Sequence, residues 1–397
     1  MATPIFQNEG YYAPAFRLAI NGQSLNPVLL RDVTQVTYRD KMDELDSVEL
    51  NVNNWDQELF KPKYEPPSKS EYKGIFEPGN KLDLIIGYAA TKSTDRIMMT
   101  GEITSLEPVF PESGVMTIAI RAMNVLSKYR KKQHTWGFDK NSIPGAGRSG
   151  IRDSEIAKLI GQWKVSDQKP GLDMEVDIEG NAFQGEAEQP SVFMNNQYDI
   201  VFLVERARLH GYSLFVDVNP KTKKERLNFR RSTALKDITY ELAWGTSLAE
   251  FRPTLTTARQ IKRVKVMGWD GKAGKPIVGQ AEWGKGGINL NDDQKSVVQA
   301  VEGREEIITD IPVTSKKQAD EVAAGILRDR LYQMIKATAT TVGLPNLRAG
   351  SRLSIQKLGP RFSGEYFVTD TTHTIGDSGY RTTFGCRREK QASGATQ

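Results

Sequence analysis

The sequence contains very little cysteine and histidine, which excludes several kinds of site. Its 397 residues include one cysteine and three histidines. A disulfide framework and a zinc site of several cysteines are therefore excluded. No pair of histidines has the spacing of metal ligands; they are His134, His210 and His373. We therefore expect no metal and no cofactor, and we assign no catalytic, cofactor-binding or metal-binding residue.

Long apolar runs are also absent. None approaches the roughly 18 residues that a membrane-spanning helix needs. The first ten residues have neither the basic segment nor the apolar segment of a signal peptide. We therefore expect a protein that is made and folded in a cytoplasm and does not insert directly into a membrane.

An excess of charge of one sign is absent as well. The formal net charge is +5 over 397 residues, which is typical of a solvated surface of mixed sign. The densest basic runs, residues 128–132 and 221–224, lie at expected strand ends or turns. Because neither is a basic helix, we expect no specific nucleic-acid binding. The sequence is still compatible with a groove or lumen through which DNA passes without specific contacts.

The patterns that are present predict a folded, mainly β chain, since 38% of the residues are hydrophobic and 26% charged. Alternating apolar and polar residues predict strands over much of the first and last thirds. Helical spacing predicts three helices, which we place at about 153–163, 198–210 and 316–336. Gly211 would end the second helix.

These elements predict four parts of the chain. Residues 1–127 would form a first tube-like antiparallel β-barrel, and residues 128–247 an α+β middle domain. Residues 248–388 would form a second barrel that carries an inserted loop, 270–300, and the helix at 316–336. Residues 389–397 would form a flexible tail. The long irregular segments 54–78, 139–152 and 270–300 are candidate surfaces for assembly.

The first and last thirds share a sequence pattern. The block from Gly79 to Leu84 parallels 350–355, the block from Thr100 to Ser105 parallels 363–368, and Ser113-Gly114 parallels Ser378-Gly379. Because three blocks recur in one order, we interpret the barrels as an internal duplication. Three chains would then present six similar domains around an axis, so that a three-fold object could join a six-fold one.

Four segments together resemble the phage late control protein D family, which includes baseplate hubs of contractile tails and the hub part of the type VI spike protein VgrG. They are residues 76–121, residues 197–229, the segment from Glu250-Phe251-Arg252-Pro253 to Asp270, and residues 373–388. The resemblance implies two tube-like β-barrels with smaller α+β domains between and beside them.

The resemblance also implies a role and partners. The chain would form a homotrimeric baseplate hub that joins the hexameric tail tube to the trimeric spike, in contact with other baseplate proteins. It would assemble in the bacterial cytoplasm as part of a virion tail or a contractile injection particle. Because VgrG-type chains continue into an OB-fold and a β-helix, and this chain stops at Gln397, we expect the spike on a separate polypeptide.

Two rival functions remain: a tail-associated cell-wall hydrolase and a receptor-binding module at the tail tip. A hydrolase would need a compact site, but Glu102 and Glu365 occupy matching repeat positions, which favours a structural role. We expect Cys386 to be a buried apolar residue, and the loop 145–150 lacks the ending of a phosphate loop. A receptor-binding module would favour clustered aromatics, whereas Trp136, Trp163 and Trp283 are scattered along the sequence. We therefore expect a structural protein and not an enzyme.

Overall fold

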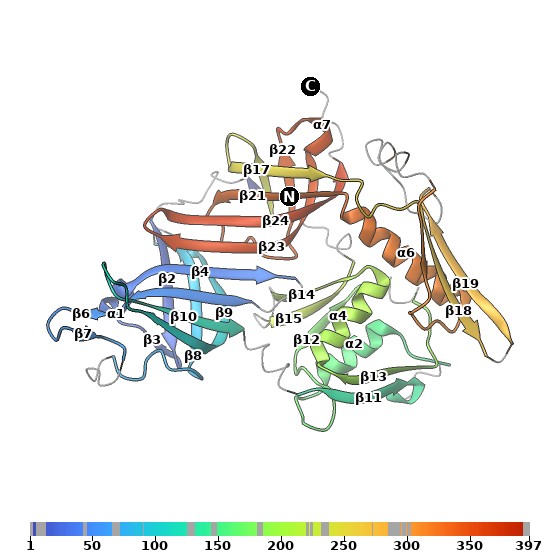
Figure 1. Ribbon diagram of the computed structural model, residues 1–397, viewed down its shortest axis with the longest axis horizontal. Helices are drawn as coiled ribbons and strands as arrows, with labels where there is room; N and C mark the ends of the chain where they lie inside the picture. The colour runs from blue at the N-terminus through green and yellow to red at the C-terminus, as the bar shows by residue number, and fades with distance from the viewer. Residues whose placement is uncertain are drawn as a thin grey trace.

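The structure is a computed structural model of the whole chain, and it confirms a mainly β fold with a large, mostly antiparallel sheet (Figure 1). It describes residues 3–4, 13–42, 46–65, 72–89, 91–124, 132–143, 149–180, 186–219, 222, 225–231, 238–271, 273–284, 295, 299 and 303–391. None of the helices in these ranges is long and apolar enough to cross a membrane.

The first part of the chain forms a sheet unit, unit 1, with the strand order β4-β5-β10-β9-β8-β2-β3. Alternating burial along these strands, as in β5, places every second side chain in one core. The strands are β2 Pro14–Ile20, β3 Gln23–Ser24, β4 Val33–Lys41, β5 Ser47–Asn53, β8 Lys81–Tyr88, β9 Thr91–Val109 and β10 Thr117–Asn124. The unit also carries helix α1 (Pro27–Asp32) and the short strands β6 (Trp55–Asp56) and β7 (Lys61–Pro62).

The last part forms unit 2, whose strand order is β17-β21-β24-β23-β22-β16-β1. Its elements are β1 Thr3–Pro4, β16 Tyr240–Ala243, β17 Leu248–Leu255, β21 Ile335–Val342, β22 Arg352–Gln356, α7 Gly359–Phe362, β23 Gly364–Gly376 and β24 Gly379–Gln391. Strand β4 of unit 1 pairs with residues 370–375 of β23, so both units belong to one sheet.

The two units share the order of their strands. In each, a meander of three antiparallel strands, β8-β9-β10 or β22-β23-β24, is followed by two further antiparallel strands, β5-β4 or β21-β17. The flanking pairs differ in direction, because β2 runs antiparallel to β8 whereas β16 runs parallel to β22. The description of the units as duplicated barrels stays a prediction.

One detail of the expected repeat is wrong, namely the equivalence of Glu102 and Glu365. Lys81 pairs with Glu102, whereas Arg352, its counterpart in the repeat, pairs with Phe367. The repeated sequence blocks are therefore offset by two residues when the strand pairing of the two units is compared. A shift of two leaves each side chain on the same face of its strand, so the alternating pattern persists although the identities do not align.

Between the two units in the sequence comes the middle domain, in which two helices pack beside short sheets. Helix α2 (Asp153–Gln162) and helix α4 (Asp199–His210) lie close to their predicted positions, and Gly211 ends α4 with φ +64°, as predicted. The other elements are β11 His134–Asp139, the short 3-10 helix η2 Lys140–Ser142, β12 Glu175–Ile178, β13 Ser191–Gln197, β14 Ser213–Val218 and β15 Glu225–Arg230.

An arm is inserted in unit 2, between β17 and β21. It consists of a small sheet covered on one face by a long helix, and Figure 1 shows it at the end of the molecule opposite β6 and β7. Its elements are β18 Arg263–Asp270, β19 Lys275–Glu282, β20 Glu305–Ile308 and helix α6 Lys316–Tyr332.

Each part has its own apolar core. One cluster fills unit 1, one fills the middle domain and one fills unit 2 with the arm. Ile375 and Tyr380, at the tip of the β23-β24 hairpin, join the core of unit 1. The hairpin of unit 2 therefore fastens the two units together. The proposed boundaries at 127 and 247 remain predictions.

Three expectations in the last third are wrong in part. The helix expected at 316–336 ends at Tyr332, because burial from Ile335 onward alternates with period two, as in a strand. The expected loop 270–300 contains strand β19, which pairs with β18, while residues 285–294 lie outside the described residues. The expected tail begins inside β24, which runs to Gln391, and residues 392–397 lie outside the described residues.

Gly325 in α6 allows this helix to approach the end of α4. A Cβ atom at this position would lie 2.5 Å from the carbonyl oxygen of Leu209. Alanine normally stabilises a helix interior by about 1 kcal/mol relative to glycine. Here we expect Gly325→Ala to lower the free energy of unfolding by about 1–3 kcal/mol, since the backbones must separate. Urea denaturation measures this change, and a stabilised variant would show that the two helices are not in contact.

Candidate functional site

Where the two units meet, one arginine is surrounded by acidic and phenolic groups. Arg348 Nε lies 2.7 Å from Asp40 Oδ2, and its Nη2 lies 3.6 Å from Asp46 Oδ2 and donates to the Tyr38 hydroxyl. Tyr38 in turn donates to Asp46 at 3.0 Å. We name Tyr38, Asp40, Asp46 and Arg348 the junction cluster. It ties the β4-β5 hairpin of unit 1 to the turn before β22 of unit 2.

The junction cluster holds two buried carboxylates against one guanidinium. Burial, and next the charge of Asp40, raise the pKa of the Asp46 carboxyl to about 8. Arg348 opposes this rise but cannot balance both carboxylates. The cluster therefore retains a proton on a carboxyl group under conditions in which an exposed aspartate would be ionised.

His373 lies beside the junction cluster and is fully buried. Its Nε2 is 2.9 Å from the carbonyl of Leu347, so Nε2 carries the proton and Nδ1 accepts from the Tyr380 hydroxyl at 2.8 Å. Burial, and next the charge of Arg348, lower the pKa of His373 to about 3. The ring is therefore neutral and serves as a fixed link between β23 and β24.

Each of the other two histidines is held by an aspartate. His134 Nδ1 lies 2.7 Å from Asp199 in the first turn of α4, and His210 Nε2 lies 2.7 Å from Asp153 in α2. Burial lowers the pKa of His210, but the hydrogen bond and the charge of Asp153 outweigh it and raise the pKa above its usual value. His210 lies in the last turn of α4, and its main partner is the carboxylate of Asp153.

Cys386 is a buried strand residue, as expected, and burial raises the pKa of its thiol. Within the described ranges, no three His, Cys, Asp or Glu side chains are grouped to hold a metal ion. Of the glycine-rich loop 145–150, residues 145–148 lie outside the described residues. Glu365 forms an ion pair with the buried Arg352.

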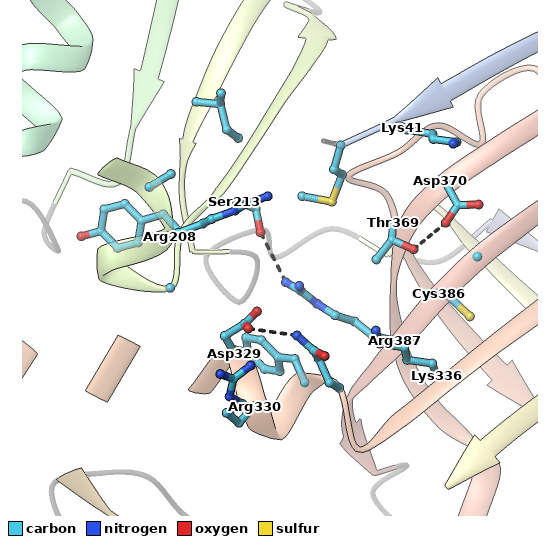
Figure 2. A pocket seen from close by; sticks show the side chains of 18 of the residues that line it. Lys41, Arg208, Ser213, Asp329, Arg330, Lys336, Thr369, Asp370, Cys386 and Arg387 are labelled. Carbon is cyan, nitrogen blue, oxygen red and sulfur yellow. Dashed lines mark hydrogen bonds between the residues drawn. The ribbon is translucent and has the colours of Figure 1, made fainter. Parts of the chain in front are cut away.

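A cavity of about 770 Å³ opens between the middle domain, the arm and unit 2. Figure 2 shows Arg208 and Ser213 on one wall, with Lys41, Thr369 and Arg387 facing them from the sheet. Arg387 is held over the rings of Tyr332 and Phe367, at 4.5 and 4.9 Å, and donates to Ser213 Oγ at 3.3 Å. The cavity therefore has a fixed cation at the boundary of the domains.

The face of the arm sheet opposite α6 has a group of exposed apolar side chains next to a row of ion-paired ones, Arg263, Lys265, Glu282 and Glu305. Val264 and Val266 of β18 point into the core, and the alternate positions point outward. We name the outward residues Met267, Trp269, Val278 and Ile307 the arm face; they are 39%, 65%, 40% and 56% exposed. An exposed apolar group of this kind is a candidate interaction surface.

A second exposed apolar group lies near β6 and β7, at the other end of the molecule (Figure 1). Phe60 connects these strands and is 79% exposed. The backbone of Asn54 bonds to Met116 at 2.9 Å, which brings the tip of the β9-β10 hairpin alongside. We name Phe60, Val109, Phe110 and Val115 the tip patch. Phe60 falls in the predicted assembly segment 54–78, and Val278 of the arm face falls in 270–300.

Two of the tryptophans that are scattered along the sequence meet in the folded protein. Trp136 and Trp163 pack together, with ring centroids 5.9 Å apart in an edge-to-face arrangement. Trp283 is buried and donates to the carbonyl of Ile261. The exposed tryptophans are instead Trp244 and Trp269.

Sequence reasoning missed Arg348 and Arg387. A signal for Arg348 did exist, because it stands between the apolar residues Leu347 and Ala349, two positions before the repeated Gly350. A charged residue in such a setting needs a buried partner. Its partners Asp40 and Asp46 lie some three hundred positions away in the sequence, so their identity could not be read from the spacing.

Comparison with solved structures places this fold among phage tail proteins. The 43 kDa tail protein of prophage MuSo2 from Shewanella oneidensis matches with a TM-score of 0.62 and 14% identity, over 95% of this chain and 98% of that chain. A tail protein of Neisseria meningitidis MC58 matches with 0.61 and 11%, over 95% and 97%.

A third similar structure is a component of the type VI secretion system of Escherichia coli, described as similar to the bacteriophage T4 tail proteins gp27 and gp5. It matches with a TM-score of 0.53 and 11% identity, over 94% of this chain and 77% of that chain. At these identities the likeness is one of fold.

Comparison of sequences gives a separate result. None of the curated proteins matches the chain. Residues 149–377 match the model of the Alg8_N family, described as the Alg8 N-terminal domain. These residues include much of the middle domain, the arm and most of unit 2. Since they make up more than half of the sequence, the chain, which has the fold of phage tail proteins, belongs to the Alg8_N family.

Proposed function

We propose that the protein is the baseplate hub of a phage tail or of a related contractile injection system. It acts as a homotrimer that joins the six-fold tail tube to a three-fold spike on a separate chain. The observation that carries this proposal is the shared strand order of units 1 and 2. Three chains with two like units each supply six similar surfaces around one axis.

The exposed apolar surfaces support an assembly of copies. The arm face and the tip patch are unlike surfaces at opposite ends of the longest axis (Figure 1). Contact between unlike surfaces of successive copies is a heterologous interface, and such interfaces generate rings when the rotation closes. We therefore assign the arm face and the tip patch to the interface of the trimer.

A structural role also agrees with the state of the reactive side chains. His134, His210 and His373 are each bonded in the interior, to Asp199, Asp153 and Tyr380. A general acid or base must reach its substrate. We therefore propose that the protein is not an enzyme, and an assay of cell-wall hydrolysis tests this point.

The mass of the purified protein in solution tests the trimer. Light scattering over a concentration series should give three times 44.4 kDa for the protein alone, or a complex that holds three copies of it when it is mixed with the spike protein. A chain that stays monomeric even with the spike protein would contradict the symmetry-adaptor role. It would favour the rival functions, a tail-associated hydrolase or a receptor-binding module.

A further inference from the structure

A cluster of charged side chains lies where helix α6 of the arm meets the middle domain. His210, in the last turn of α4, has its Nε2 atom 2.7 Å from Asp153 Oδ2, and Arg206 Nε lies 2.6 Å from Asp153 Oδ1. Glu186 and Glu321 lie close enough to His210 for their charges to act on it. We name Asp153, Glu186, Arg206, His210 and Glu321 the α4-α6 cluster.

Glu321 links the two sides of this contact directly. Its Oε2 atom, on α6, accepts a hydrogen bond from the backbone N–H of Ala187 at 2.8 Å. The neighbouring Glu186 is 3% exposed and accepts from the Tyr212 hydroxyl at 2.9 Å. Helices α2, α4 and α6 and the segment before β13 therefore meet around His210, whose side chain is 10% exposed.

Apolar packing contributes little to the same contact. The middle domain has one core, and unit 2 with the arm has another. Of the middle-domain residues that the structure describes, Leu209 alone packs against the core that contains α6. The polar groups of the α4-α6 cluster therefore decide how firmly α6 holds the middle domain.

The charge balance of the cluster depends on two protons. Burial lowers the pKa of His210, but the hydrogen bond and the charge of Asp153 outweigh it, so the ring keeps its proton where an exposed histidine loses it. Burial raises the pKa of the Glu321 carboxyl, so this group ionises at a higher pH than an exposed glutamate. With both protons lost, Arg206 alone faces three carboxylates, namely those of Asp153, Glu186 and Glu321.

The other titratable groups that face His210 and Glu321 do not cancel this change. Burial favours the protonated form of Asp153, but Arg206 and His210 outweigh it and lower its pKa, so Asp153 stays ionised. Burial raises the pKa of Tyr212, so the phenol stays neutral. Lys317 Nζ is 3.9 Å from Glu321 but belongs to an exposed side chain, whose attraction is screened by water.

For both His210 and Glu321 the pKa in the folded protein lies above its ordinary value. The folded state then binds more protons than the unfolded chain, so the stability that these protons provide falls as pH rises. We propose that the contact between α6 and the middle domain is a proton-dependent latch, which charged His210 holds closed and which loosens when His210 and Glu321 lose their protons. The proposal goes beyond the hub role and does not depend on the trimer.

The latch acts on one side of the middle domain only. On the other side, Phe215 of β14 packs edge-to-face against Phe367 of β23, with ring centroids 6.3 Å apart. This apolar contact has no proton to lose. The middle domain therefore stays attached to unit 2 while its contact with α6 opens.

Hydrogen–deuterium exchange with mass spectrometry tests the proposal on the full-length protein. Exchange is measured at pH 6 and pH 9, and each rate is divided by the intrinsic rate at that pH. The protection of residues 186–189, which include the amide bonded to Glu321, should fall about tenfold or more, since one unit of pKa shift corresponds to a factor of ten. Strand β15, in the middle domain, should stay protected, which distinguishes local opening from unfolding.

Matched variants locate the proton. His210→Gln keeps a donor for Asp153 but carries no charge, so residues 186–189 should already be poorly protected at pH 6. His134→Gln is the control, because His134 is also buried and lies 2.7 Å from an aspartate, Asp199, outside the α4-α6 cluster. This control should keep the pH dependence of the wild type.

Glu321→Gln has the opposite expected effect. It keeps an oxygen acceptor for Ala187 and removes one negative charge, so the protection at pH 9 should stay near its value at pH 6. Misfolding cannot produce this gain, so the variant decides the matter even if His210→Gln fails to fold. The proposal is overturned if protection in the wild type is equal at both pH values, if His134→Gln acts like His210→Gln, or if Glu321→Gln opens at pH 9 as the wild type does.

Discussion

Replacing Arg348 with leucine is expected to lower the free energy of unfolding by about 3–5 kcal/mol at pH 7, because removal of one partner leaves buried charge uncompensated. Asp40 is 4% exposed and also accepts from the backbone of Ala349 at 3.0 Å, so it cannot turn toward solvent. Unfolding in urea, followed by tryptophan fluorescence and circular dichroism, measures the loss.

The loss should depend on pH. In the folded protein the pKa of Asp46 is raised to about 8 from an ordinary 3.8. Between these values the folded state keeps a proton that the unfolded chain releases, so stability falls as pH rises. Without Arg348, the charge that opposes the rise is gone, so the pKa of Asp46 rises further and stability continues to fall above pH 8. The difference between variant and wild type should therefore be larger at pH 9 than at pH 6.

Two further variants serve as controls. Asp46→Asn mimics the protonated acid and should flatten the fall of stability with pH. Arg39→Leu removes an exposed arginine of the same strand β4, whose distance to Glu49 is 3.4 Å, and should cost less than about 1 kcal/mol. If Arg348→Leu cost no more than Arg39→Leu, the junction cluster would not fasten the two units.

Changing Trp269 to glutamate is expected to weaken self-association by about a hundredfold or more, since a large aromatic side chain at the centre of an interface contributes several kcal/mol. Trp269 is 65% exposed and pairs across the sheet with Pro276, beside Met267 and Val278 on the arm face. A charge there would be desolvated on contact. Light scattering of the variant should give the mass of one chain at concentrations at which the wild type is trimeric.

Phe193→Glu is the matched control for Trp269→Glu. Phe193 lies on β13 of the middle domain and is 64% exposed. Phe193 is nearly as exposed as Trp269 and is also an aromatic residue, but it belongs neither to the arm face nor to the tip patch. Its variant should remain trimeric, whereas Phe60→Glu in the tip patch should dissociate. Equal effects of Phe193→Glu and Trp269→Glu would contradict the assigned interface.

Several features could be predicted from the sequence because they depend on local chemistry. Alternating apolar residues predict strands such as β5 and β8, and the observed burial follows that alternation. Helical spacing and a terminal glycine predict α4 and its end at Gly211. The boundary between α6 and β21 was missed because Leu331, Met334 and Ile335 fit a helical face as well as the start of a strand.

By itself, the sequence determined the mainly β fold, the positions of most strands and helices, and the scarcity of metal-binding side chains, since each depends on composition or on neighbours within a few residues. Only the tertiary structure decided which distant residues meet. It brought Arg348 to Asp40 and Asp46, shifted the repeat by two positions, and gathered carboxylates from α2, α6 and the segment before β13 around His210. These contacts depend on sheet register and on the packing of separate cores, which local patterns do not encode.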